Sequence, residues 1–176
     1  MGLFDSLGNI LKQYAGGSAS GQVPSDVQEH FDQVAQAVPQ STVADGLSAA
    51  FRSNQTPVFG EMIGSLFSNS TGEQKAALLN QLAGAAGPKV LSRIPGGSAL
   101  ASLLSSGDRQ LTPEQAQQIS PEAVQQLAAH AEKADPSIVD KASSFYAQHP
   151  TLVKTMGGAA LSVVMARIAE GQSRAA

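Results

Sequence analysis

Cysteine and tryptophan are both absent from the 176-residue chain. Without cysteine, the chain cannot form a disulfide framework, a thiolate zinc site or a cysteine nucleophile. The first residues also lack the basic segment and the continuous apolar run of a secretory signal. Together these absences fit a reducing compartment, and we expect the protein to be cytoplasmic.

Positive charge is scarce as well. The chain has 11 lysines and arginines against 14 acidic residues, which gives a formal net charge of -3. Proteins that bind nucleic acid depend on contacts between basic side chains and phosphates. The segment from Leu111 to Lys133 has the outline of a helix-turn-helix, but it contains no arginine and only Lys133 as a lysine. We therefore expect no nucleic-acid partner.

Long apolar runs and alternating strand patterns are also missing. The longest weakly polar run, between Lys154 and Arg167, spans about 12 residues, whereas a helix that crosses a bilayer needs roughly 20. We expect this run to be a buried helix. No cluster of β-branched and aromatic residues between turn signals indicates a strand. Because 42% of the residues are apolar, the chain can still bury a core.

What the chain contains instead is repeated helix punctuation. Ser, Thr or Asp caps and early prolines precede apolar residues at helical spacing. Thr71 and Gln74 have the spacing of a capping box, and Gly87-Pro88 is a typical end of a helix. The last helix is expected to follow Pro150 and to include Ile168. The pattern predicts an all-α, compact multi-helix bundle of about eight to nine short helices, with no sheet.

The spacing of two segments allows a diverged internal duplication. Residues 27–39 and 124–136 both begin with Val-Gln and end with Pro, and each is followed by a helix with a phenylalanine, Phe51 or Phe145. Convergent helix punctuation explains the same spacing equally well.

The N-terminal segment is the strongest candidate for an interaction site. Residues 1–15 form an amphipathic helix in our interpretation, residues 16–22 a Gly/Ser-rich linker, and residues 23–172 a single all-α domain. The apolar positions of the first helix are Leu3, Phe4, Leu7, Ile10, Leu11 and Tyr14. A tethered amphipathic helix can dock into a partner, onto a second copy or onto a membrane surface, or it can pack on its own core.

No catalytic motif is evident. The three histidines, His30, His130 and His149, are far apart in the sequence, and Asp26 lies one helical turn from His30 but provides only half a site. There is no Gly-x-Ser-x-Gly motif. We expect a non-enzymatic protein with no cofactor and no metal. The leading hypothesis is an interaction or scaffold protein that associates through its first helix.

A carrier of an apolar small molecule is the alternative function. The many small residues would leave imperfectly filled space between helices, and apolar pockets between helices are common ligand sites. The expected wall residues are Phe31, Phe51, Phe59, Met62, Phe67, Phe145 and Met156. Gly60-x-x-x-Gly64 places small residues on one helix face, which favours close packing in the core or a self-association face.

Three stretches resemble a known family. The opening Met1-Gly2-Leu3-Phe4-Asp5-Ser6-Leu7, the Gly-rich linker and the helix start Ile119-Ser120-Pro121-Glu122-Ala123-Val124 are similar to the YidB-like family of bacterial proteins. The resemblance implies a small, helical, cytoplasmic bacterial protein. It implies no catalytic or binding residue, because none is assigned in that family.

Overall fold

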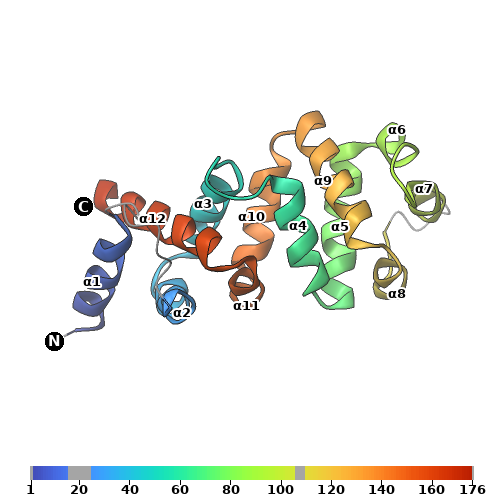
Figure 1. Cartoon of the computed structure of the whole chain (residues 1–176). Helices are drawn as coiled ribbons and strands as arrows, with labels where there is room; N and C mark the ends of the chain where they lie inside the picture. The colour runs from blue at the N-terminus through green and yellow to red at the C-terminus, as the bar shows by residue number, and fades with distance from the viewer. Residues whose placement is uncertain (1, 16–24, 106–109, 176) are drawn as a thin grey trace. The chain divides into compact units, whose positions relative to one another are not determined.

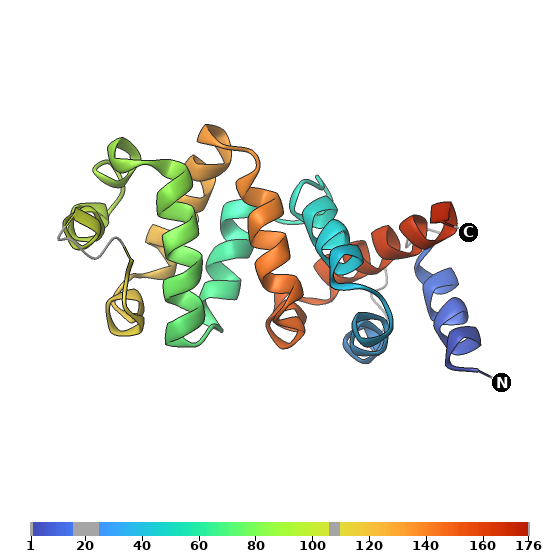
Figure 2. The same cartoon turned by 180° about the vertical axis from the view of Figure 1, so that it is seen from behind.

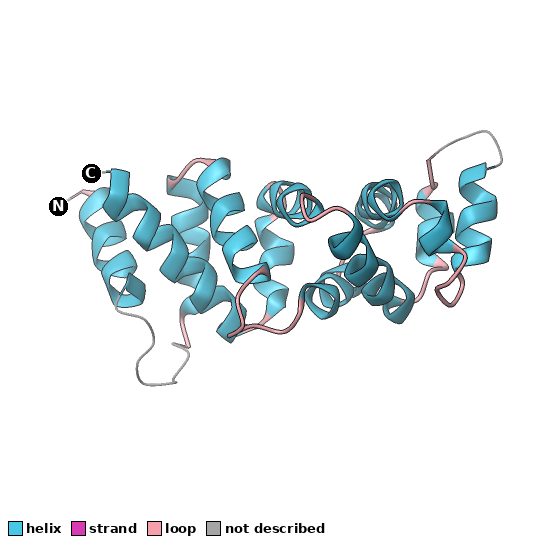
Figure 3. Ribbon diagram, turned by 90° about the horizontal axis from the view of Figure 1, so that it is seen from above, coloured by secondary structure: helices cyan, strands magenta, loops and turns pink. Residues whose placement is uncertain are grey.

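The computed structural model describes residues 2–15, 25–105 and 110–175, apart from the side chains of Leu3, Phe4 and Ala175. Within these ranges the structure consists of helices and loops, and no strand occurs (Figure 1 and Figure 3). The all-α fold class is therefore confirmed. The predicted linker, residues 16–22, lies outside the described residues.

The described residues form twelve α-helices and one 3-10 helix rather than eight to nine helices. The helices are α1 (Leu3–Ala15), α2 (Val27–Ala37), α3 (Gln40–Phe51), α4 (Phe59–Ser68), α5 (Gly72–Ala86), α6 (Pro88–Leu91), α7 (Gly97–Ser105), α8 (Pro113–Gln117), α9 (Pro121–Ala134), α10 (Ile138–Ala147), α11 (Pro150–Val153), η1 (Lys154–Met156) and α12 (Gly158–Ala175). Three of these elements, α6, α11 and η1, have four residues or fewer. Elements this short have no room for a helical apolar repeat, which explains the low predicted number.

The chain divides into two compact units. The first unit comprises Met1–Pro57 and Ser143–Ala176, and the second comprises Val58–Ala142. The two ends of the chain thus belong to the same unit. We describe each unit separately.

In the first unit, α12 is the central helix and packs against α3, α1 and α2 (Figure 2). The contact with α3 is close at Gly46, where an added Cβ would lie 2.8 Å from Cγ1 of Ile168 and 3.1 Å from the carbonyl oxygen of Val164. Phe31 and Leu47 are fully buried in this unit. The absence of a side chain at Gly46 therefore lets two helix backbones approach.

In the second unit, α4 packs on α9, and α5 packs on α8 and α9. Gly60 and Gly64 face Gln125 of α9, and a Cβ at Gly60 would lie 2.6 Å from the carbonyl oxygen of Gln125. The close-packing interpretation of Gly60-x-x-x-Gly64 is confirmed, since both glycines face a helix of the same unit.

The helix ends follow their local chemistry. Thr71 and Gln74 form the expected capping box, and Thr112 and Gln115 form another. Gly87 ends α5 with a φ of 76°, a left-handed conformation that glycine adopts without steric cost.

One predicted helix is wrong. The segment from Pro150 to Ile168 is not continuous, because it divides into α11, η1 and α12. Gly157 follows η1 with a φ of 92°, which interrupts the right-handed helix, and α12 begins at Gly158. The apolar residues on both sides of this break keep a helical spacing, so their periodicity conceals it.

In the described part of the chain, no helix combines the length and the apolar character needed to cross a membrane.

Candidate functional site

Helix α1 begins at Leu3 because Gly2 and Asp5 pair across the first turn. The Gly2 N–H donates to Oδ2 of Asp5 at 3.3 Å, and the Asp5 N–H donates to the Gly2 carbonyl oxygen at 2.9 Å. Asp5 lies in the first turn and Lys12 in the last turn, so both charges complement the helix dipole. Local chemistry therefore supports the helix before any tertiary contact forms.

Helix α1 packs against α12 and α2 of the first unit (Figure 1). Leu11 is 8% exposed and Tyr14 is 2% exposed. The C-terminal half of α1 is therefore docked on its own fold.

Tyr14 joins α1 to α2 through His30. The Tyr14 hydroxyl lies 2.9 Å from Nδ1 of His30, and the two rings meet edge to face with centroids 5.9 Å apart. Burial raises the pKa of the Tyr14 hydroxyl above its ordinary value, and the negative charge of Asp26 raises it further. The hydroxyl therefore keeps its proton at neutral pH, and it donates to Nδ1 when the His30 proton is on Nε2.

The position of α2 is set by a second polar contact. Nζ of Lys154, in η1, lies 2.7 Å from Oδ2 of Asp32, and Nε2 of Gln28 donates to the Lys154 carbonyl oxygen at 3.5 Å. Both contacts tie α2 to the segment that precedes α12. The two helices that pack against α1 are thus linked to each other through Lys154.

The residues of the predicted apolar face of α1 differ in how deeply they are buried. Leu11 and Tyr14 are buried, whereas Leu7 and Ile10 remain partly exposed. The side chains of Leu3 and Phe4 lie outside the described residues. The outer edge of the apolar face is therefore not fully covered by the first unit.

The three histidines contact different partners in the described residues. His30 contacts Tyr14, the His130 ring contacts the carbonyl oxygen of Gln126 in its own helix, and His149 lies against Phe145 with ring centroids 4.9 Å apart. Among the described residues, no three His, Asp or Glu side chains could jointly hold a metal ion.

The seven predicted wall residues of a ligand pocket belong mainly to the cores of the two units. Phe31, Phe51, Phe59, Met62 and Phe67 are each less than 5% exposed, and Phe145 and Met156 are partly exposed. None of the seven lines the cavity of about 300 Å³ between α5, α6 and α7. Sequence reasoning missed this cavity because it searched for aromatic walls. Its available signal was the small residues Ala83, Gly84 and Ala101.

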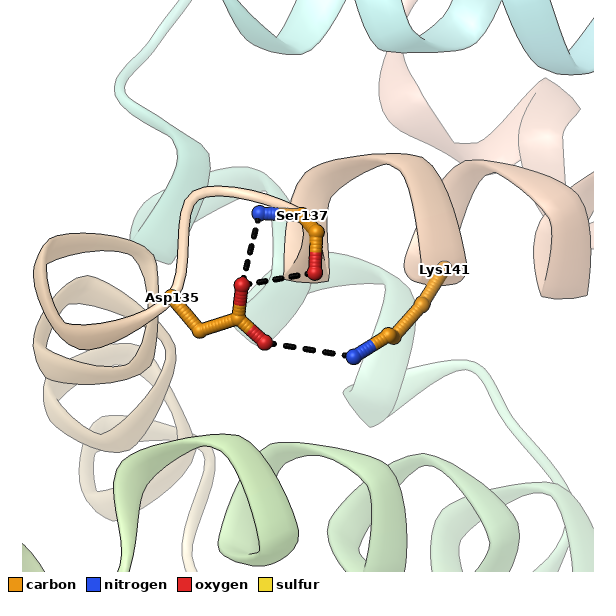
Figure 4. A network of polar contacts seen from close by, with 3 residues as sticks. All are labelled: Asp135, Ser137 and Lys141. Carbon is orange, nitrogen blue, oxygen red and sulfur yellow. Dashed lines mark hydrogen bonds and ion pairs between the residues drawn. The ribbon is translucent and has the colours of Figure 1, made fainter.

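A polar network starts α10 (Figure 4). Oδ1 of Asp135 accepts from the Ser137 hydroxyl at 2.6 Å and from the Ser137 N–H at 3.1 Å, while Oδ2 accepts from Nζ of Lys141 at 3.2 Å. The Ser137 hydroxyl bond is the largest influence that holds the pKa of Asp135 below its ordinary value, followed by the Lys141 bond. Asp135, Ser137 and Lys141 all lie at one exposed helix start, so the network has a capping role.

Comparison with known proteins identifies no relative. No family model, curated protein or solved structure matches this chain. The YidB-like resemblance stays a prediction, and any function must be argued from the residues themselves.

Proposed function

We propose that this chain is a non-enzymatic protein that acts through association, with α1 as the contact element and a second copy of the chain as its partner. One observation carries the proposal. The apolar face of α1 is docked through Leu11 and Tyr14, whereas Leu7 and Ile10 remain partly exposed at its outer edge.

The spacing of this edge suits a helix-to-helix contact. Leu3, Leu7 and Ile10 follow the i, i+4, i+7 pattern, next to Leu11 and Tyr14, which face the fold. A helix with two adjacent apolar stripes can dock on its own chain with one stripe and on another helix with the other. Association would then leave the packing of α1 against α12 and α2 unchanged.

A second copy is the simplest partner, because every copy presents the same edge. Two such edges can meet about a two-fold axis, and two-fold dimers are the commonest oligomers. A membrane surface has less support. Lys12 is the one basic residue in α1, so anionic lipid would attract the helix weakly.

The test is the oligomeric state of the full chain, measured by analytical ultracentrifugation over a wide concentration range. We expect a dimer that forms reversibly and is lost in the double variant Leu7→Glu/Ile10→Glu. The matched control is Asn9→Glu/Gln13→Glu, which adds the same charge at exposed positions of α1. The control should dimerise like the wild type, and circular dichroism should show equal helicity in all three proteins.

A wild-type chain that remains monomeric at every concentration would overturn the second copy as partner. A dimer that persists in Leu7→Glu/Ile10→Glu would remove α1 from the interface. Vesicles of neutral phosphatidylcholine that bind a monomeric chain through Leu7 and Ile10 would instead assign the edge to a membrane surface.

A further inference from the structure

The second unit contains a cavity that the proposed association does not use. It lies between α5, α6 and α7, and its volume is about 300 Å³. These three elements are the green and yellow-green helices of Figure 2. The volume is at the lower end of the range for small-molecule sites in proteins, about 300 to 1,000 Å³.

The cavity exists because small residues line one face of α5. Asn80, Ala83 and Gly84 recur at i, i+3 and i+4, so they share that face. A Cβ added to Gly84 would meet no atom within 4 Å. Leu91 of α6 and Leu104 of α7 provide the larger apolar surfaces of the wall. The three helices therefore border a cavity that is open to solvent, and Gly84 itself is exposed.

The polar groups of the wall suit a neutral ligand. Among the residues that the structure describes, no lysine, arginine, aspartate or glutamate lines the cavity. Oδ1 of Asn80 accepts from the Leu111 N–H at 2.8 Å, which sets the orientation of the amide. Its Nδ2 is then the group that remains to donate to a ligand. Ser105 donates its own proton to the carbonyl oxygen of Ala101 at 2.8 Å, so it is not a competing donor.

We propose that this cavity binds a neutral, mainly aliphatic molecule that carries one hydrogen-bond acceptor, such as the carbonyl of a ketone or ester. The carbonyl oxygen accepts from Nδ2 of Asn80, and the aliphatic chain lies against Leu91 and Leu104. The site is independent of α1, which belongs to the first unit.

The experiment is a titration of the ¹⁵N-labelled full chain with 2-octanone, followed by amide NMR shifts. We expect saturable shifts in α5, α6 and α7, with a dissociation constant in the millimolar to high micromolar range that is usual for so small a ligand. Octanoate, which has a similar chain and a negative charge, should bind about tenfold more weakly, because the described residues of the wall include no lysine or arginine.

Two leucine substitutions separate filling of the cavity from a general effect of the side chain. Gly84→Leu places the new side chain in the cavity and should weaken 2-octanone binding by about tenfold or more. Gly171→Leu is the matched control, since it also lies in a helix and a Cβ there meets nothing within 4 Å. It should bind like the wild type. Ala101→Leu, which fills the cavity from α7, replaces Gly84→Leu if that variant does not fold.

Three results would overturn the proposal: no saturable shift at the solubility limit of 2-octanone, equal binding by the cavity-filled variant, or shifts outside α5, α6 and α7. Equal affinity for octanoate would overturn the assignment of a neutral ligand.

Discussion

The hydroxyl of Tyr14 lies 2.9 Å from Nδ1 of His30, and this contact links the N-terminal helix to α2 across sixteen positions of sequence. Tyr14 is nearly fully buried, while Leu7 and Ile10 on the same helix are not. The helix thus has a docked C-terminal half and an apolar edge that is only partly buried. The proposed dimer depends on this difference.

Loss of the Tyr14 hydroxyl should weaken the docking of α1. Tyr14→Phe keeps the ring that packs against His30 but removes the hydrogen bond, and we expect a loss of about 0.5 to 1.5 kcal/mol in the free energy of unfolding. Urea denaturation measures this loss, and faster hydrogen exchange of the α1 amides should accompany it. In a His30→Ala background the same substitution should cost almost nothing further. Equal losses in both backgrounds would show that the bond to His30 does not stabilise α1.

The start of α10 should respond to acid through Asp135. The pKa of this carboxyl is lowered in the folded protein, so its stabilising contribution is present above the ordinary value of about 4 and is lost as the pH falls through the lowered folded value. Ser137→Ala removes the largest cause, and the pKa of Asp135, followed by ¹³C NMR of the carboxyl, should rise toward its ordinary value. Ser92→Ala is the control, because that hydroxyl bonds to Lys89 in α6. An unchanged pKa in Ser137→Ala would contradict the network.

Gly60 should not tolerate a side chain. Its Cβ would lie 2.6 Å from the carbonyl oxygen of Gln125, a backbone atom that can move only with α9. Gly60→Ala should therefore lower the free energy of unfolding by about 1 to 3 kcal/mol. Gly84→Ala is the matched control: its Cβ meets open space, and the change should be neutral or should stabilise the helix by up to about 1 kcal/mol. Similar effects of both substitutions on thermal unfolding would be evidence against the close contact of α4 and α9.

Much of the local structure was determined by the sequence itself. The capping box at Thr71 and the end of α5 at Gly87 depend on groups within a few residues of each other, and both occur as predicted. The helical class follows from the same short-range chemistry, because every helix bonds its backbone within its own segment. The first helix is of this kind as well, since Gly2 and Asp5 form hydrogen bonds across its first turn.

The tertiary structure alone decided which of these local elements meet. No short-range pattern pairs Tyr14 with His30, sets Gly60 against Gln125, or leaves space beside Gly84, because each depends on how separate helices pack. The break at Gly157 was hidden for a related reason: glycine accepts both helical and left-handed backbone, so the residue type alone does not show that its φ is positive. Hydrogen bonds within one helical turn can be predicted from sequence. Helix packing, exposed apolar faces and cavities arise only when the helices come together.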